Sequence, residues 1–352
     1  MSGAQLSTPP ACPSGLGGLP GTSAQEAARI LAGELPDLLH VPQLPQRGPG
    51  ADDVGRTMAL LAGVSSDLAV ETTVDGWRIT TGSPRVMRRA ASWLTEDLDC
   101  LEEAAAGYRG TVKSQLLGPW SLAASVELPT GERVLRDQGA CVELAEALGE
   151  ACRHHIADLI RRFPGCPIVL QIDEPMLPTV LAGAVGTASG LSRYAPIDVQ
   201  PAQANLARVL DAIGGVGAVP GVACLRPDAP IDLMVRAGAQ LLALDFVSSL
   251  AEEPLGRAWE SGIALLAGSI TPAMVEPAAH GREPDDALTS RAVRERAARL
   301  GLADPRWLAR VVITPTGSLA SIPPALVVPT YRACRAAGRV LRDDVDVPSE
   351  QQ

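Results

Sequence analysis

The chain has 352 residues, a mass of 36.5 kDa and a formal net charge of −10 at pH 7. Apolar residues make up 46% of it, which is enough for a large folded core. The acidic balance disfavours nucleic acid and anionic membrane surfaces as partners. The sequence has no apolar run of the roughly 18 residues that a transmembrane helix needs. Residues 1–18 also lack the basic start and apolar stretch of a signal peptide, so we expect a cytoplasmic protein.

Short apolar runs alternate with helical segments along most of the chain. The segment 141–163 has apolar residues every three or four positions, which is the period of an amphipathic helix. Ser23 or Thr22 is placed to cap a helix over 24–34. Further helices are predicted at 84–105, 203–213, 285–300 and 325–340. Strands are predicted near 14–19, 37–41, 111–117, 167–172, 217–224, 241–246, 262–267 and 310–314.

Eight strands, each followed by helical material, predict an α/β fold of the single (β/α)8 TIM-barrel type. The long gap between the second and third strands contains LAVETTVDGWRIT (68–80), in which Asp75-Gly76 suits a hairpin turn. We expect this β-hairpin to be an insertion on a barrel over residues 14–340, with flexible tails at 1–13 and 341–352. The alternative, a doubly wound open sheet, is less favoured because no G-x-G-x-x-G motif follows the first strand in the required register.

Barrel enzymes place their active sites at the carboxyl ends of the strands, and QIDEP (171–175) is the most informative of these ends. Asp173 and Glu174 follow an apolar run, so their side chains point to opposite sides while the strand persists. One of them is then able to face the barrel interior and bind an amine or act as a base, while the other braces neighbouring backbone. The alternative is that both cap a helix.

These motifs resemble those of a known enzyme family. KSQLLGPW (113–120), QIDEPML (171–177) and GGLP (17–20) are similar to the catalytic barrel of cobalamin-independent methionine synthase. The chain most resembles the short, single-barrel actinobacterial members of that group, in the superfamily that includes uroporphyrinogen decarboxylase. The resemblance implies methyl transfer from a methylated folate or another donor to homocysteine or a related thiol, as in methionine biosynthesis. It also implies that Gly17, Gly18 and Asp173 bind the amino-acid substrate.

The resemblance further implies a zinc site, but this sequence departs from the family at the ligand positions. Ala223 and Leu225 stand where the family has histidine and cysteine, with Cys224 between them, and Gly317 replaces another cysteine. Cys224 and Asp245 are the remaining candidate metal ligands. Because zinc normally takes three or four protein ligands, we expect this site to bind zinc weakly, if it binds the metal at all.

Other ionisable residues each allow more than one functional interpretation. Lys113, the only lysine in the chain, is a candidate for substrate binding or for a Schiff base, although an ion pair with Asp173 or Glu174 is the simpler interpretation. Among the four histidines, His40 follows the second strand, and it belongs either to the pocket rim or to an exposed loop. Cys152 and His155 share a helix face and are possible metal ligands there, but a buried core thiol and a surface imidazole are the favoured interpretation.

The leading hypothesis from the sequence is therefore a methionine synthase-like methyltransferase with a degenerate zinc site and small-molecule substrates. One alternative is a zinc-free, divergent or inactive homologue that binds a small molecule or a partner. Another is a metal-independent lyase akin to uroporphyrinogen decarboxylase, for which Arg47 and Arg226 are the pocket candidates.

Overall fold

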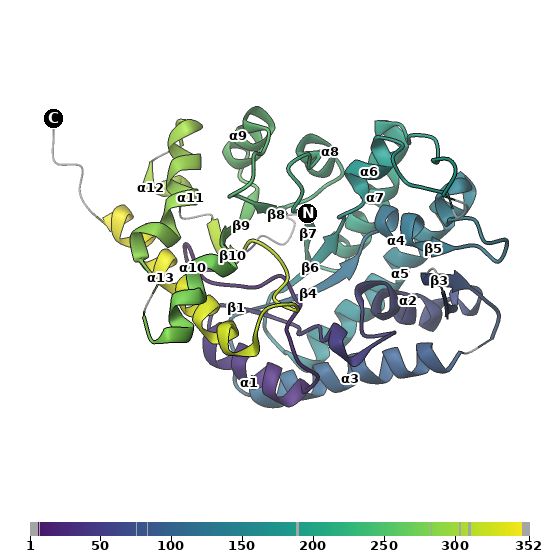
Figure 1. The fold of residues 1–352 in the computed structure, drawn as a ribbon, viewed down its shortest axis with the longest axis horizontal. Coiled ribbons are helices and arrows are strands. Elements are labelled where there is room, and N and C mark those ends of the chain that lie inside the picture. The colour runs from purple at the N-terminus through teal and green to yellow at the C-terminus, as the bar shows by residue number, and fades with distance from the viewer. Residues whose placement is uncertain are drawn as a thin grey trace.

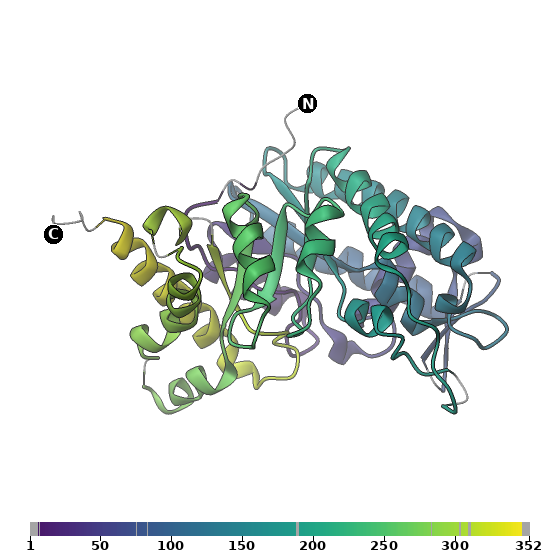
Figure 2. The same cartoon turned by 90° about the horizontal axis from the view of Figure 1, so that it is seen from above.

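A curled parallel β-sheet of seven strands forms the centre of the molecule (Figures 1 and 2). The computed structural model describes residues 6, 8–74, 76–82, 84–187, 190–282, 284–302, 304–308 and 311–346. The strands, in their spatial order, are β1 (Leu38–His40), β4 (Thr111–Leu117), β6 (Ile168–Asp173), β7 (Val219–Ala223), β8 (Leu241–Asp245), β9 (Ala264–Ile270) and β10 (Val311–Pro315).

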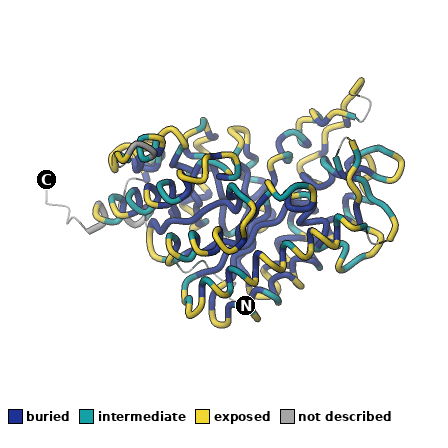
Figure 3. The backbone as a smooth tube through the Cα atoms, turned by 60° about the horizontal axis from the view of Figure 1, so that its bottom comes forward, coloured by how far each residue is buried: buried dark blue, intermediate teal, exposed yellow. Residues whose placement is uncertain are grey.

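Helices connect these strands and cover the outside of the sheet, as the exposed outer turns in Figure 3 show. They are α1 (Ala24–Glu34), α2 (Asp53–Val64), α3 (Arg85–Ala104), α4 (Pro119–Ser125), α5 (Gln138–Arg162), α6 (Leu177–Leu181), α7 (Val199–Gly214), α8 (Ile231–Arg236), α9 (Glu252–Glu260), α10 (Pro272–Val275), α11 (Asp286–Arg299), α12 (Pro305–Leu308) and α13 (Val327–Asp346). The hydroxyl of Ser23 accepts a hydrogen bond from the backbone of Glu26, which confirms the predicted start of α1. Among the described residues, no helix is both long and apolar enough to cross a membrane.

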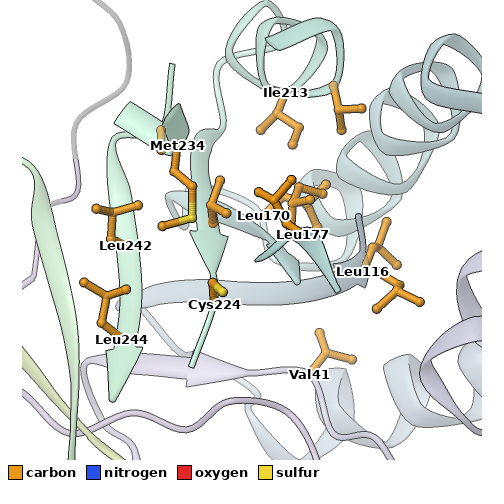
Figure 4. Close-up of a cluster of buried hydrophobic side chains, with 14 of the residues drawn as sticks. Val41, Leu116, Leu170, Leu177, Ile213, Cys224, Met234, Leu242 and Leu244 are labelled. Atoms are coloured by element: carbon orange, nitrogen blue, oxygen red, sulfur yellow. The ribbon is translucent and has the colours of Figure 1, made fainter. Parts of the chain in front are cut away.

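The two faces of the sheet pack differently. Alternate strand residues such as Leu170, Leu242 and Leu244 point outward into the large apolar core shared with the helices (Figure 4). The residues between them, including Val169 and Leu241, form a smaller apolar cluster on the inner face. Because strand side chains alternate, a shift of one residue exchanges these environments.

The first predicted strand, 14–19, is not a regular strand. It contains three glycines and is flanked by Pro13 and Pro20, and only isolated bridges form here, Pro13 with Ile313 and Gly18 with Gln43. Ser14 also donates its hydroxyl hydrogen to the carbonyl of Leu38 in β1. The segment therefore lies between β10 and β1, the two edge strands of the sheet, and bridges the gap of a TIM-like barrel.

A separate three-stranded sheet lies between β1 and α5 in the chain. Its strands are β2 (Val70–Thr73), β3 (Gly76–Ile79) and β5 (Val126–Glu127). β2 and β3 pair antiparallel over the stretch where the sequence predicts a hairpin, and β5 adds a parallel strand that was not predicted. Residue 75 of the predicted turn lies outside the described residues.

Described residues on both sides of the predicted barrel limits, 14 and 340, pack against the rest of the fold. Ala11 and Cys12 are buried, and the carbonyl of Cys12 accepts a hydrogen bond from Ile313. At the other end, α13 continues to Asp346, six residues beyond the predicted limit of the barrel. The N-terminal segment packs against α13, which gives each end a partner.

Gly338 in α13 is the position where this packing tolerates no side chain. A Cβ atom there would overlap the carbonyl oxygen of Ala11. We expect Gly338→Ala to lower the free energy of unfolding by about 1–3 kcal/mol, measured by urea denaturation. Gly33 in α1 is the matched control, because a Cβ there meets nothing within 4 Å. Gly33→Ala should be neutral or stabilising by about 0.4–1 kcal/mol, and equal losses in both variants would contradict this packing.

Candidate ligand pocket at the strand ends

A cavity of about 320 Å³ opens at the carboxyl ends of the strands. This is the end at which barrel folds carry their active sites. Three of its residues end strands: Leu117 in β4, Asp173 in β6 and Ala223 in β7. Its lining consists of Leu16, Gly18, Gln43, Asp53, Leu117, Gln171, Asp173, Pro175, Ala223, Leu225, Arg226 and Ser318. The cavity thus combines an apolar wall with two carboxylates.

Asp173 is the predicted site residue that the structure places in this pocket most clearly. Its Oδ1 accepts a hydrogen bond of 2.6 Å from Nε2 of Gln171, two residues earlier on the same face of β6. Burial raises the pKa of the Asp173 carboxyl to about 7, although the Gln171 hydrogen bond opposes the shift. Asp53 raises this pKa further because it adds a second negative charge to the pocket.

Lys113 lies beneath the pocket in the barrel interior, where it is fully buried. Its Nζ donates a 3.0 Å hydrogen bond to Oε1 of Gln171. The expected direct ion pair with Asp173 or Glu174 is not found among the described residues, because the Gln171 amide lies between the lysine and Asp173 and bonds to both. Burial lowers the pKa of Lys113 to about 8, and the nearby charge of Asp173 partly offsets this effect.

Glu174, the other predicted candidate for substrate binding, bonds to the start of α4. Its carboxylate accepts hydrogen bonds of 2.9 Å from the backbone N–H groups of Trp120 and Ser121. The Ser121 hydroxyl donates a third, of 2.6 Å. Glu174 therefore holds the start of α4, and it does not line the pocket. The division between a pocket-facing Asp173 and a bracing Glu174 is the one that strand alternation predicts.

Glycines shape the loop that passes over the opposite side of the pocket. Gly17 has a φ of +114°, and a Cβ there would lie 2.6 Å from the Gln115 amide and 2.7 Å from Oε1 of Gln43. At Gly18, which lines the cavity, a Cβ would overlap the hydroxyl of Ser318. The absence of side chains at both positions lets this loop approach the pocket closely.

Sequence reasoning missed several pocket residues. Asp53, Gln43 and Ser318 reach the cavity from three different loops or helix starts, and nothing in their local sequence marks them. Arg226, a predicted candidate, does line the pocket, where it pairs with Asp228 at 2.9 Å.

The other candidate residues lie away from the pocket. Arg47 pairs with the buried Asp97 at 2.9 Å. His40 is neither on the rim nor in an exposed loop: its Nε2 lies 2.8 Å from the hydroxyl of Tyr331, and burial lowers its pKa to about 3. Cys152 is part of the outer core. His155, predicted to lie at the surface, is instead buried, 2.8 Å from the Ser114 hydroxyl.

The predicted metal ligands are not brought together. Cys224 points away from the pocket into the outer core, beside Met234 and Leu242 (Figure 4). Ala223 and Leu225, on either side of it, are the residues that face the cavity, and neither is able to bind a metal. Asp245 instead accepts hydrogen bonds from the backbone of the turn that follows β8. Among the described residues, no group of three or more His, Cys, Asp or Glu side chains is arranged to hold a metal ion. The donors present therefore do not fit a zinc site.

The curled parallel sheet of seven strands, with helices on its outside, is an α/β fold that resembles a TIM barrel. A similar solved structure is that of a B12-independent methionine synthase from Shewanella sp. W3-18-1, in complex with selenomethionine. Its TM-score is 0.58 at 11% sequence identity, and the match covers 95% of this chain and 98% of that one. A putative phosphonomutase from Burkholderia cenocepacia J2315 matches with a TM-score of 0.35 and 12% identity, over 87% of this chain and 88% of that one. No protein-family model and no curated protein sequence matches the chain. The match to the methionine synthase shows a distant fold relationship.

The orientation of Cys224 yields a test of metal binding. Protein purified without chelators should contain well under one equivalent of zinc, because one thiol in the apolar core and one carboxylate bonded to a turn leave too few donors. Cys224→Ser should leave the zinc content, measured by elemental analysis, unchanged. One equivalent of tightly held zinc that disappears in Cys224→Ser would contradict the structure of this strand end.

Proposed function

We propose that the chain binds a small molecule carrying a protonated amine in the pocket at the strand ends, with an α-amino acid as the ligand class. The observation that carries this proposal is Asp173, a half-buried carboxylate that lines the cavity and has no ion pair among the described residues. Withdrawing an unpaired carboxylate even partly from water is costly, and a ligand ammonium offsets that cost through a charge-assisted hydrogen bond.

The surroundings of Asp173 support a cationic ligand. The lysine in the barrel interior is held away from Asp173 by the Gln171 amide, so it does not neutralise the carboxylate by direct contact. Asp53 adds a second negative charge to the same cavity. Two carboxylates in a small cavity repel each other, and a bound ammonium relieves this repulsion.

The remaining walls suit an apolar side chain on the ligand. Leu16, Leu117 and Leu225 line the cavity together with Ala223, so a thioether or aliphatic group would be shielded from water there. The methionine synthase of similar fold was solved with selenomethionine, which makes methionine and selenomethionine reasonable first probes.

This proposal selects one of the hypotheses that the sequence leaves open. Zinc-dependent methyl transfer to a thiol needs a metal site that the donors around Cys224 do not form. A lyase acting on a large polyanion would need an arginine cluster, whereas Arg226 is the only arginine among the described lining residues and is paired with Asp228. A zinc-free homologue that binds an amino acid agrees best with the pocket.

Replacement of the pocket carboxylate tests the proposal. Asp173→Asn keeps the shape of the side chain but removes its charge, so methionine binding should weaken by about 1.5–3 kcal/mol, or roughly 10- to 150-fold in Kd. Isothermal titration calorimetry measures the change. Asp245→Asn serves as the control because Asp245 lies at a strand end but outside the pocket lining. Unchanged affinity in Asp173→Asn, or equal losses in both variants, would contradict the proposal.

The raised pKa of Asp173 predicts a pH dependence. A carboxyl with a pKa of about 7 is mostly protonated below that pH, and only its ionised form attracts an ammonium. The association constant should therefore rise about tenfold per pH unit below pH 7 and level off above it, while the ligand amine stays protonated. Titrations from pH 5 to pH 8 check this slope, and Asp173→Asn should abolish it. A flat wild-type profile would show that Asp173 is not the group that binds the amine.

A further inference from the structure

A second cavity, of about 550 Å³, lies along α13 and shares no lining residue with the central pocket. It is bordered by α13, by the start of α11 and by the short 3₁₀ helix at Glu276–His280. Figures 1 and 2 show these elements together at the end of the molecule where the chain terminates. We call this cavity the arginine groove, after its lining residues Arg282, Arg332, Arg335, Arg339 and Arg342.

Four of these arginines form a stripe on α13. Residues 332, 335, 339 and 342 are spaced by three or four positions, so they lie on one face of the helix over about 15 Å. The adjoining face of the helix is buried through Tyr331, Cys334 and Leu341. Residues 327–342 contain no Asp or Glu. In α5, by contrast, Arg153, Arg161 and Arg162 all pair with carboxylates of their own helix.

The positive charges in the arginine groove are only partly compensated. Glu34 pairs with Arg335 and lies 3.8 Å from Arg332. Arg342 donates to the neutral carbonyl of Pro10. The guanidinium groups of Arg282 and Arg339 have no hydrogen bond or ion pair among the described residues, and Asp286 is the one acidic residue in the described lining. A chain of net charge −10 thus concentrates unpaired positive charge in one cavity.

We propose that the arginine groove binds a compact anion that carries two or more phosphate groups. Like charges spaced by three or four residues on a helix repel each other, and a multivalent anion between them turns this repulsion into attraction. Guanidinium groups bind phosphate oxygens in a bidentate manner, and arginines on facing elements are able to contact one phosphate from two sides. The cavity volume is typical of small-molecule sites, which are roughly 300–1,000 Å³.

A compact ligand agrees better with the overall charge than a nucleic acid does. The acidic surface of the protein repels a long polyanion along its whole length. An anion confined to the groove is screened from distant carboxylates beyond a Debye length of about 8 Å at physiological ionic strength, while the guanidiniums act on it at contact distance.

Inorganic pyrophosphate, titrated calorimetrically into the full-length protein at low salt, tests the proposal. We expect saturable binding that weakens as salt increases, with Arg339→Ala and Arg282→Ala each raising Kd at least tenfold. Both arginines are exposed, so thermal unfolding should confirm that the variants remain folded. Arg236→Ala is the matched control, because this exposed arginine ends α8 and lines neither cavity. It should bind pyrophosphate like the wild type.

Several outcomes would overturn the proposal. These are no binding at millimolar pyrophosphate, an equal loss in Arg236→Ala, citrate binding as tightly as pyrophosphate, or tighter binding of single-stranded RNA than of pyrophosphate. Asp173→Asn should leave pyrophosphate affinity unchanged, because the two cavities share no residue. Failure of the groove and failure of the amine pocket are therefore distinguishable.

Discussion

The Gln171 amide controls the electrostatics of the barrel interior because it bonds to a lysine on one side and a carboxylate on the other. Its Oε1 accepts a hydrogen bond from the buried Lys113 and its Nε2 donates one to Asp173, so one neutral group bonds to both ionisable side chains. A direct Lys113–Asp173 ion pair would neutralise the carboxylate that faces the pocket. The amide instead leaves Asp173 with a free side toward the cavity, and the raised pKa of Asp173 follows from this buried position.

Side chains alternate between the two faces of a strand, and this explains why the predicted metal ligand Cys224 does not line the pocket. On β6 the period places Gln171 and Asp173 on the inner face, while Ile172 enters the outer core. At the end of β7 it places Ala223 and Leu225 at the cavity and turns Cys224 outward. Cys224 is therefore adjacent to pocket residues in the sequence but does not line the pocket. Burial raises its pKa to about 12, so the side chain is a protonated thiol near neutral pH.

The sequence predicts the parts of this molecule that depend on local patterns. The bounds of α1 follow from Ser23 and the helical period, and the opposite roles of Asp173 and Glu174 follow from alternation. Prediction from the sequence fails where contacts between segments distant in the chain determine the structure. The first predicted strand is not regular because this glycine-rich segment forms only isolated bridges, to Ile313 in β10 and to Gln43 after β1. Asp53 enters the pocket through the packing of α2, which no motif reveals.

The central claim is that the pocket carboxylate binds the ammonium of an amino-acid ligand. Crystals grown with selenomethionine as an added ligand test this claim directly, because anomalous scattering locates selenium independently of the surrounding density. We expect a selenium peak beside the leucines of the pocket, with the ligand nitrogen within hydrogen-bond distance of the Asp173 carboxylate. A ligand whose amine lies elsewhere, with Asp173 still bonded to Gln171 alone, would contradict it.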